Sequence, residues 1–584
     1  MNYKLNQDTA QKKVGTLEAS KKLLPLLKGE EKQIAISAVA LLFNSATNLI
    51  APLIIGLTVD KYIQTGDFGG VLYWAAILSV LFLIGLATNY IQTKVMGGVG
   101  QRILFKLRNK IFLKLQELPI AFFNQNKAGD LISRINNDTD KLNQFFSQAL
   151  TQFIGNLCIM IGTGLFILFI HIKLGAAALF PALLLLIFTQ LISPWVKKKN
   201  SENLKSTGGL SSEIQESLNN FKAIIAFNRR DYFRKRFNEA NTKSFQTGIW
   251  AGIANTIFTP IYALSYNIAQ IIVLGYGIYL ISQGDFTIGL LISFFTYLSR
   301  FYDPLRHLAA LWASFQVALA GWDRISSILS LETDLTQIED TSKKSSDAVL
   351  EFKNVSFTYP EGKHVLSNIN FTLDHGKTYA LVGPTGGGKT TTASLMARLF
   401  DPTEGTVLLN GKDIRSYTSE ERTAKIGFIL QEPFLFSGTL KDNILYGNDE
   451  YNNTDTESLK KTLTDAGLDT LLSQFSEGLE TKITGNDAIS LGQKQLIAFI
   501  RAVLRKPEIL ILDEATANID TVTEQLLETV LTQLPKSTTR VIIAHRLNTI
   551  EAADEIFFVN GGSLTLAHSM EEAVHMLLDE KKES

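Results

Sequence analysis

Cysteine is almost absent from this sequence, in which Cys158 is the single example among 584 residues. A disulfide framework or a cysteine-bound metal site within one chain is therefore excluded. Cys158 lies inside an apolar stretch, where packing is the expected role of a free thiol. An excess of one charge is missing too, because 56 Lys and Arg residues balance 56 Asp and Glu residues. The balanced charge gives no reason to expect a nucleic-acid partner.

A short apolar signal segment is also missing from the first residues, which are polar and rich in lysine up to Leu24. No cleavage site follows the first long apolar run, so we expect an uncleaved, cytoplasmic N-terminus. The leucines between Leu23 and Leu27 predict either a short interfacial elbow helix or a frayed start to the first long helix. The length exceeds the roughly 250–300 residues that one hydrophobic core supports, so more than one domain is expected.

Long apolar runs fill the first half of the chain. A helix needs about 20 apolar residues to cross the hydrocarbon core of a membrane. Six runs meet this requirement, at Ile34–Val59, Val71–Ile91, Leu150–Ile170, Leu174–Val196, Ile249–Ile281 and Ile288–Leu311. Pro260 and Pro304 predict kinks in the fifth and sixth of these spans. The first half therefore predicts an α-helical membrane domain of six long spans.

The loops between these runs alternate between short and long. The long loops carry most of the basic residues, within Arg102–Lys114 and Lys197–Arg236. The positive-inside rule then places both long loops and both termini in the cytoplasm. Because the long loops also have helical periodicity, the spans are expected to extend into the cytoplasm. We predict a transmembrane domain at residues 1–335, a polar linker at 336–348 and a second domain at 349–584.

A phosphate-binding loop marks the second domain, which begins with short alternating strands at Val349–Lys353 and Val355–Tyr359. The loop follows the predicted strand Thr378–Val382 and opens a helix, which is the context that the motif G-x-x-x-x-G-K-[ST] requires. Its glycines let backbone N–H groups face the phosphates of ATP, Lys389 reaches the β- and γ-phosphates, and Thr390 binds Mg²⁺. The predicted ATP-binding residues of the loop are Gly383, Pro384, Thr385, Gly386, Gly387, Gly388, Lys389, Thr390 and Thr391.

Two acids follow a second apolar strand, Ile509–Leu512. Such a run is typical of a buried parallel strand with a site at its C-terminal end. Asp513 is then expected to hold Mg²⁺, and Glu514 to act as the general base on the attacking water. A further strand, Val541–Ala544, ends at His545, and a lone histidine there is more often structural than catalytic. Together with the loop, these features predict an α/β P-loop nucleotide-binding domain.

These motifs, in this order, resemble the ATP-binding-cassette exporters of the half-transporter type along nearly the whole chain. The resemblance implies that Tyr359 stacks on adenine and that Gln431, within Ile429–Phe436, senses Mg²⁺ and the γ-phosphate. It implies a D-loop that ends at Asp520 and a switch role for His545. It also implies that the signature loop contains Ser490, Leu491, Gly492 and Gln493.

The resemblance extends to the cytoplasmic loops of the membrane domain. The sequence from Arg108 to Asp138, which includes Gly129-Asp-Leu-Ile-Ser-Arg134, is similar to the family's segment after the second span. It implies a short coupling helix near 124–131. A second coupling region is implied at 221–231, and in this family that region docks on the cassette of the partner chain.

The signature loop departs from the family pattern, because Leu491 stands where Leu-Ser-Gly-Gly-Gln has its first glycine. In this family the signature loop of one chain grips the nucleotide of the other, so a leucine there predicts a weak signature. A second half-transporter chain with an intact signature would compensate, which favours a heterodimer. A homodimer in which the leucine is tolerated stays an alternative.

The resemblance implies ATP-driven, Mg²⁺-dependent export of hydrophobic or amphipathic compounds by alternating access, in a multi-pass bacterial inner or plasma membrane. A lipid flippase on the same fold and an importer with an exporter-type fold stay open. A non-transporting cassette ATPase is disfavoured by the six spans. Several polar residues in the spans are candidates to line a cavity or, for most of them, to form interhelical hydrogen bonds. They are Asn44, Asn48, Asn156, Gln190, Asn255, Tyr262, Tyr266, Asn267, Gln270, Tyr297 and Arg300.

Overall fold

The chain forms two compact units. The computed structural model describes residues 3–5, 23–333, 335–339, 347–360, 362–431, 433–451, 454–484, 489–513, 524–527, 531, 534–543, 550–569, 571–573 and 575–576. The helical unit comprises Gln7–Leu115 and Gly129–Ser330, and the sheet unit comprises Met1–Asn6, Gln116–Ala128 and Leu331–Ser584. The segment Gln116–Ala128 therefore belongs to the sheet unit, although the helical unit flanks it on both sides in the sequence.

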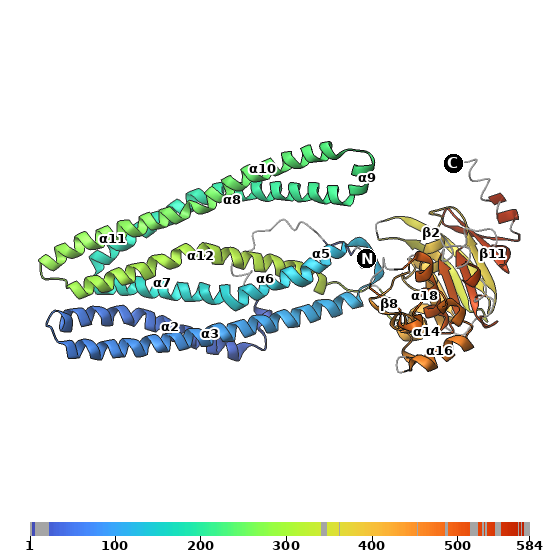
Figure 1. The fold of residues 1–584 in the computed structure, drawn as a ribbon, viewed down its shortest axis with the longest axis horizontal. Helices are drawn as coiled ribbons and strands as arrows, with labels where there is room; N and C mark the ends of the chain where they lie inside the picture. Colours follow the sequence, from blue (N-terminus) through green and yellow to red (C-terminus); the bar gives the residue numbers. More distant parts are fainter. Residues whose placement is uncertain are drawn as a thin grey trace. The chain divides into compact units, whose positions relative to one another are not determined.

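Long helices dominate the helical unit, as its apolar runs predict. The leucines of the expected elbow form η1, a short 3-10 helix. Figure 1 shows α10 beside α8, with α9 joining them at one end, and α7 beside α12. The helices are η1 (Leu24–Leu27), α2 (Glu31–Thr58), η2 (Val59–Ile63), α3 (Phe68–Glu117), α5 (Ala128–Ser133), η3 (Arg134–Asp138), α6 (Thr139–Gln144), η4 (Phe145–Ala149), α7 (Leu150–Ile170), α8 (Ile172–Asn219), α9 (Phe221–Ala226), α10 (Arg230–Thr256), α11 (Phe258–Ser282) and α12 (Ile288–Leu329).

The prediction of six spans is not exact. Among the described residues, 5 helical segments are long and apolar enough to cross a membrane: Glu31–Ile63, Phe68–Glu117, Ala128–Ile170, Ile172–Asn219 and Arg230–Ser282. The sixth predicted span lies within α12, which is helical throughout but carries Arg300, Asp303 and Arg306. These charged residues lower its apolar content. The fifth span is interrupted at Ile257, just before Pro260, whereas α12 continues past Pro304.

The N-terminal turn of α12 packs very closely on the C-terminal end of α2. A Cβ atom on Gly289 would lie 2.0 Å from the carbonyl oxygen of Gly56, so only glycine permits this approach. The carboxylate of Asp60 accepts hydrogen bonds from the backbone N–H of Gly289 at 2.7 Å and from the hydroxyl of Thr287 at 2.5 Å. These contacts fix the two helices together at this end.

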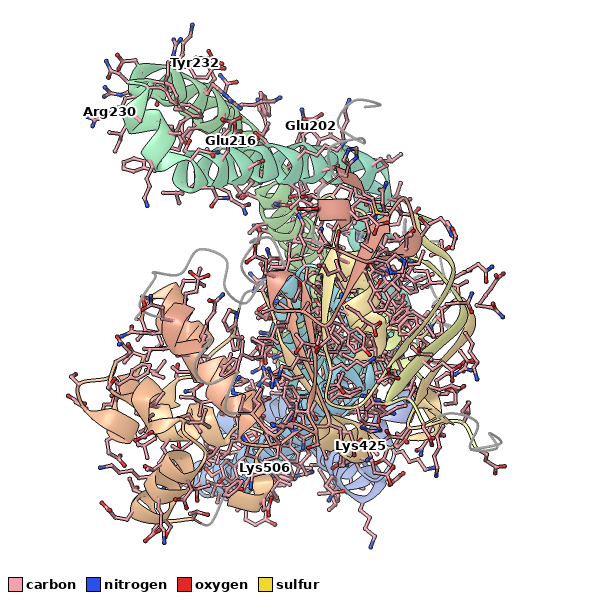
Figure 2. All side chains as sticks on the ribbon, turned by 90° about the vertical axis from the view of Figure 1, so that its right-hand side faces the viewer. Glu202, Glu216, Arg230, Tyr232, Lys425 and Lys506 are labelled. Carbon is pink, nitrogen blue, oxygen red and sulfur yellow. The ribbon has the colours of Figure 1, made fainter. Side chains whose placement is uncertain are left out.

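The arm made by α8 and α10 contains much of the second basic loop. Figure 2 shows Glu202 and Glu216 along α8, and Arg230 and Tyr232 at the start of α10. Arg236 of α10 pairs with Glu213 at 2.5 Å and with Glu216 at 3.3 Å, which ties the two helices together. The second predicted coupling region, 221–231, contains the short helix α9 and the first residues of α10.

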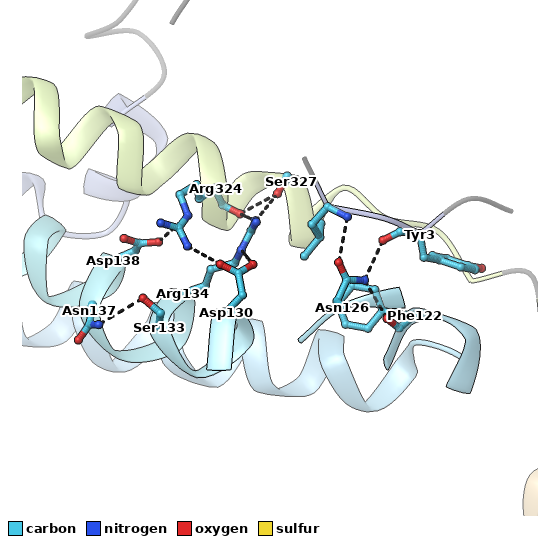
Figure 3. Close-up of polar contacts among 11 residues, drawn as sticks. Tyr3, Phe122, Asn126, Asp130, Ser133, Arg134, Asn137, Asp138, Arg324 and Ser327 are labelled. Carbon is cyan, nitrogen blue, oxygen red and sulfur yellow. Dashed lines mark hydrogen bonds and ion pairs between the residues drawn. The ribbon is translucent and has the colours of Figure 1, made fainter. Parts of the chain in front are cut away.

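A buried ion-pair network joins α5 and η3 to the C-terminal end of α12 (Figure 3). Arg134 is 1% exposed and donates to Asp130 at 2.8 Å, to the carbonyl of Arg324 at 2.7 Å and to the hydroxyl of Ser327 at 2.9 Å. Arg324 in turn pairs with Asp130 at 2.7 Å and with Asp138 at 3.2 Å. Arg134 and Asp138 are thus buried, each beside an opposite charge, whereas Asp130 and Arg324 are partly exposed.

Two larger sheets form the framework of the sheet unit. The four-stranded sheet has the order β2-β1-β4-β5 and is antiparallel. The six-stranded sheet has the order β12-β11-β3-β10-β9-β6 and is parallel except for β12. The strands are β1 (Leu350–Thr358), β2 (His364–Leu373), β3 (Thr378–Val382), β4 (Glu404–Leu409), β5 (Lys412–Asp413), β6 (Ile426–Ile429), β7 (Gly438–Thr439), β8 (Lys482–Ile483), β9 (Ile509–Asp513), β10 (Thr539–Ile543), β11 (Glu555–Asn560) and β12 (Ser563–Ala567).

The two short strands predicted at 349–353 and 355–359 are one strand, β1, with a register shift between Phe352 and Val355. Asn354 has a φ of 50°, which lets the strand continue past the irregularity. The sheet unit also contains helices. They are α4 (Ile120–Gln125), α13 (Lys389–Met396), η5 (Ile414–Ser416), α14 (Ser419–Lys425), α15 (Leu440–Leu445), η6 (Asp449–Tyr451), α16 (Thr456–Asp465), α17 (Asp469–Leu472), η7 (Gly478–Glu480) and α18 (Leu491–Val503).

The first predicted coupling helix, 124–131, has different bounds in the structure. The short helix α4 ends at Gln125 and α5 begins at Ala128, with extended backbone at Asn126 between them. The residues near the N-terminus of the chain pack on this break (Figure 3). The backbone N–H of Tyr3 donates to Gln125 Oε1 at 2.8 Å, and Asn126 exchanges 3.0 Å hydrogen bonds with Tyr3 and Leu5. Tyr3 is 1% exposed, so its ring is fully packed.

Candidate nucleotide-binding site

The phosphate-binding loop follows the C-terminal end of β3, which is an inner strand of the six-stranded sheet. Its glycines adopt conformations that other residues rarely take, with φ values of 149° at Gly383, 86° at Gly386 and 114° at Gly388. A Cβ atom on Gly383 would lie 2.0 Å from the carbonyl oxygen of Val559 in β11. Small residues are therefore required both for the turn and for its packing on the neighbouring strand. The helix α13 begins at Lys389 directly after this turn.

Lys389 lies over the loop that it is expected to serve. Its ammonium group donates to the carbonyl oxygen of Gly383 at 2.7 Å and to that of Pro384 at 2.9 Å. The side chain is buried, with 6% of its surface exposed. A buried ammonium needs such acceptors, and phosphate oxygens are acceptors of the same kind with a negative charge. The lysine is thus held at the loop, in reach of a phosphate that enters it.

The side chains of Thr390 and Asp513 meet at the edge of the sheet. The hydroxyl of Thr390 donates to Asp513 Oδ1 at 3.3 Å, and Asp513 is 3% exposed. Thr390 is the second residue of α13 and Asp513 the last residue of β9, which β10 separates from β3. A hydroxyl and a carboxylate are the hard oxygen donors that Mg²⁺ prefers. The structure thus brings together the two residues that the sequence predicted as Mg²⁺ ligands.

Tyr359 lines a pocket of about 210 Å³ next to the loop. Its hydroxyl forms a 3.0 Å hydrogen bond with the hydroxyl of Thr391, so the ring is tied to the start of α13. The edge of the ring packs against Phe357 at 4.8 Å and Phe400 at 5.5 Å between centroids. The half-buried ring is a suitable surface for a flat aromatic group such as adenine.

The same pocket is lined by the short helix α4 through Ala121, Asn124 and Gln125. Sequence reasoning missed this contribution, and it also missed Phe400. Both belong to segments that are distant from Tyr359 in the chain, and no local motif marks them. The segment Gln116–Ala128 therefore contacts the region where adenine is expected to stack.

Gln431 follows a strand that is the direct neighbour of the strand ending at Asp513. It follows β6, which ends at Ile429 and pairs in parallel with β9, whose last residue is Asp513. The C-terminal ends of parallel strands meet at one edge, where ligands usually bind. The strand pairing therefore brings the backbone near Gln431 to the edge that also carries Thr390 and Asp513.

The predicted signature residues form the N-terminus of α18. The hydroxyl of Ser490 accepts a hydrogen bond from the backbone N–H of Gln493 at 3.2 Å, and the amide of Gln493 accepts one from the backbone of Ser490 at 3.1 Å. This capping box fixes the start of a 13-residue helix. Gly492 is buried, whereas Leu491 is 37% exposed on the surface of the unit. The residue that departs from the family pattern thus faces outward.

Three predicted site residues, Glu514, Asp520 and His545, lie outside the described residues, and their roles stay predictions. Glu514 follows Asp513 directly in the sequence, and His545 follows the strand β10 at a distance of two residues, since β10 ends at Ile543. The strands that lead to them, β9 and β10, are neighbours in the sheet. Both strands point their C-terminal ends to the edge that holds the phosphate loop.

Comparison with known proteins agrees with this architecture. Residues 34–305 match the family model of the ABC transporter transmembrane region, and residues 366–517 match that of the ABC transporter. The uncharacterized ABC transporter ATP-binding protein YfiC of Bacillus subtilis (strain 168) is 32% identical over 562 residues, which cover 93% of this chain and 90% of that protein.

Two further relatives carry functional names. The ATP-dependent lipid A-core flippase of Pectobacterium atrosepticum is 29% identical over 558 residues, covering 95% of each chain. The probable multidrug resistance ABC transporter ATP-binding/permease protein YheH of Bacillus subtilis is 31% identical over 519 residues, covering 86% of this chain and 74% of that protein. With apolar spanning helices and an ATP-binding domain in one polypeptide, the chain belongs to the ABC transporter family and is a multi-pass membrane ATPase of the half-transporter type.

Proposed function

We propose that this chain is one half of an ATP-driven exporter of hydrophobic or amphipathic compounds. The observation that carries the proposal is the pair Thr390 and Asp513, 3.3 Å apart beside the phosphate loop, in a chain that also holds apolar helices of spanning length. Hydrolysis of ATP beside Thr390 and Asp513 supplies free energy, and the helices form a path through the membrane. The relatives named for lipid A-core and for multidrug resistance support a substrate with a large apolar part. A lipid flippase is the second candidate on the same evidence.

Mg²⁺ fits the oxygen donors of Thr390 and Asp513, and we propose that these residues hold it together with Gln431. A bound Mg²⁺ would neutralise charge on the β- and γ-phosphates during phosphoryl transfer. Lys389 would exchange its contacts with the two loop carbonyls for phosphate oxygens. Glu514 would orient and deprotonate the attacking water, and His545 would contact the γ-phosphate, as their positions after β9 and β10 suggest.

The contact between α4 and the Tyr359 pocket supports a route from nucleotide binding to the membrane helices. We propose that adenine stacks on Tyr359 and alters the packing of Asn124 and Gln125. The helix α4 directly follows α3 in the chain and directly precedes α5, so a displacement of α4 acts on both helices. In this proposal α4 and α9 are the two coupling elements, at 120–125 and 221–226. ATP binding and release would then drive alternating access.

Leu491 supports a heterodimer as the working assembly. In a head-to-tail pair of cassettes, the N-terminus of α18 would face the nucleotide of the partner chain, where donors grip the γ-phosphate. A leucine at the first position of that helix adds bulk beside the phosphate. A partner chain with an intact signature would complete the site built from Lys389 and Glu514, and Leu491 would face the second, slower site. In a homodimer both sites would carry the leucine.

We further propose that the pump lies in a bacterial plasma membrane with the sheet unit and both termini in the cytoplasm. The basic residues of the long loops, such as Arg102 and Arg236, support this orientation through the positive-inside rule. The relatives named for a lipid A-core flippase and for multidrug resistance support outward transport. A sidedness assay in inverted vesicles tests it, because uptake of substrate into inverted vesicles indicates export and loss from them indicates import.

The test of the proposed ATPase uses the full chain reconstituted in proteoliposomes, alone and with a second half-transporter. We expect little ATP hydrolysis by the chain alone and strong ATP hydrolysis when the second half-transporter is present. Glu514→Gln should abolish the activity of the two chains together. Glu457→Gln, which removes an exposed carboxylate on α16, is the matched control and should leave the activity unchanged.

Strong hydrolysis by the chain alone would contradict the heterodimer, and hydrolysis that survives Glu514→Gln would contradict the assignment of the base. The variant Leu491→Gly gives an independent measure, since it should raise the activity of the chain alone if the leucine weakens the signature. Movement of fluorescent lipid between leaflets, compared with efflux of an apolar dye, distinguishes the flippase from the multidrug pump.

A further inference from the structure

An arginine lies deep in the last long helix of the helical unit. Arg300 follows the first residue of α12, Ile288, by about 12 residues, or about 18 Å along the helix at 1.5 Å per residue. The hydrocarbon core of a membrane is about 30 Å thick, so Arg300 lies near its middle. A charged side chain at that depth is unfavourable unless the protein or a ligand compensates its charge. The position therefore requires a physical reason.

Part of the reason is a carbonyl that Pro52 leaves without its helical donor. A proline has no N–H, so the carbonyl four residues earlier in α2, that of Asn48, loses its usual partner. Arg300 Nη1 donates to this carbonyl and, at 2.6 Å, to the side-chain oxygen of Asn48. Asn48 is held in place by Asn44, which accepts from it at 3.0 Å and donates to the carbonyl of Gly85 at 3.1 Å. A polar chain thus crosses from α12 through α2 to α3.

Capping carbonyls of α2 does not require a charge. The hydroxyl of Ser293 donates to the carbonyl of Pro52 at 2.7 Å, and the hydroxyl of Tyr297 donates to that of Leu49. Both residues lie on α12, Ser293 two turns and Tyr297 one turn before Arg300, and they bond carbonyls of α2 with neutral groups. Arg300 bonds the carbonyl of Asn48 with a guanidinium, which has more donors than one carbonyl needs. It also carries a full positive charge, which the carbonyl does not require.

The N–H donors that Asn48 does not use lie on one edge of the guanidinium. Nη1 uses both of its hydrogens on Asn48, whereas Nε and Nη2 contact no acceptor among the described residues. No carboxylate of the described residues forms an ion pair with Arg300, and Asp303, one turn further along α12, instead accepts a hydrogen bond from Ser299 at 3.3 Å. The side chain is half-buried. The Nε and Nη2 edge is the one that binds a carboxylate or phosphate with two parallel hydrogen bonds.

We propose that the free edge of Arg300 binds the anionic head group, a carboxylate or a phosphate, of an amphiphilic substrate within the helical unit. The inference rests on the proposed transport of amphiphiles and narrows its substrate class to anionic ones. Asn48 is a positioning residue, because it holds Nη1 and so directs the opposite edge away from α2. The negative charge of the substrate supplies the compensation that the protein does not, and the apolar helices accommodate its chains.

Binding can be measured without hydrolysis or a partner chain. The full chain is placed in nanodiscs of phosphatidylcholine, and the affinities of three fluorescent probes are compared: a fatty acid, a phosphatidylglycerol and a fatty alcohol, each with the same fluorophore. We expect Arg300→Gln to weaken the fatty acid or the phosphatidylglycerol at least tenfold, as the loss of hydrogen bonds to a charged group implies. The fatty alcohol should change less than twofold. Which anionic probe loses affinity identifies the head group.

Two variants separate anion binding from the structural duty of Arg300. Pro52→Ala restores an N–H to the Asn48 carbonyl, so Arg300→Gln in that background removes the charge without leaving the carbonyl unpaired. The anionic probe should stay at least tenfold weakened there, and recovery of its affinity would overturn the proposal. Arg306→Gln removes another arginine of α12 and should change the affinity less than twofold. An equal loss in Arg306→Gln, or an equal loss for the alcohol in Arg300→Gln, would also overturn it.

The binding test of the anion site and the test of the proposed pump can fail separately. Selective, Arg300-dependent binding in a chain that never transports the probe would leave the anion site intact and contradict the proposed transport. Binding with no preference for the anionic probes in a chain that does transport amphiphiles would overturn the anion site alone. Arg300→Lys keeps the charge but loses the two-pronged edge, and it should retain part of the preference.

Discussion

Replacing Arg134 with methionine should loosen the C-terminal end of α12 from η3. The arginine is 1% exposed and makes three hydrogen bonds, to the carboxylate of Asp130, to the carbonyl of Arg324 and to the hydroxyl of Ser327 (Figure 3). Methionine reproduces the apolar stem of arginine, so the change removes the charge and the donors at the tip and keeps the packing along the stem. Asp130 would then be left with Arg324 as its ionic partner.

The size of the effect follows from burial. Breaking a buried ion pair by removing one partner costs about 3–5 kcal/mol, whereas an exposed pair is worth about 0–1 kcal/mol. The carboxylate of Asp130 is 19% exposed, so water reaches it in part and the lower value, about 3 kcal/mol, applies. A change of 3 kcal/mol corresponds to more than a hundredfold change in a local opening equilibrium.

Amide hydrogen exchange measured by mass spectrometry reports this opening directly. Peptides that contain the last turns of α12, near Arg324 and Ser327, should exchange about a hundredfold faster in Arg134→Met. The control is Arg236→Met, which removes an arginine that pairs with two carboxylates, those of Glu213 and Glu216, but is 33% exposed. Exchange there should rise less than tenfold. Equal effects of the two substitutions would refute the reasoning that burial decides the contribution of these pairs.

Three further outcomes are expected. Gly289→Ala places a Cβ atom 2.0 Å from the carbonyl of Gly56, so α2 and α12 must separate, and tryptophan-monitored unfolding should show a loss of about 1–3 kcal/mol. Tyr3→Ala removes a buried ring from the break after α4 and should speed amide exchange around Asn126 without affecting peptides of α16. Burial raises the pKa of Glu508, but hydrogen bonds from Asn410 and Lys425 outweigh it and lower the pKa below its usual value of 4.5. The stability measured by calorimetry should therefore fall as the pH drops below that value, and Glu508→Gln should remove the part of this loss that Glu508 contributes.

The parts of the molecule that the sequence predicted well are those encoded by contiguous residues. The loop from Gly383 to Thr390 carries its own conformational demands, and the strands β3 and β9 coincide with the predicted runs at Thr378–Val382 and Ile509–Leu512, extended by Asp513. Apolar residues in a short unbroken run have one suitable place, the interior of a parallel sheet. The proximity of Thr390 and Asp513 then follows from the common edge of that sheet.

The parts that sequence reasoning missed depend on contacts between distant segments. Nothing in the residues around Asn124 indicates that α4 lines the pocket of Tyr359, and the helix was expected to extend to Leu131 instead of ending at Gln125. The hydrogen bond from Asn126 to the carbonyl of Tyr3 competes with a continuous helix, and it joins residues more than 100 positions apart. Similarly, Arg300 reduces the apolar content of the sixth predicted span. Its contact with the Asn48 carbonyl, which Pro52 leaves without a helical donor, is visible only in the structure.

The packing of Tyr3 and Leu5 on Gln125 and Asn126 affects how the protein should be handled in the laboratory. A purification tag or a fluorescent protein fused directly before Met1 would begin two residues from a fully buried ring. Such a fusion would pull on a segment that shares a pocket with Tyr359. A tag at the other end of the chain, or a long flexible spacer before Met1, leaves these contacts undisturbed.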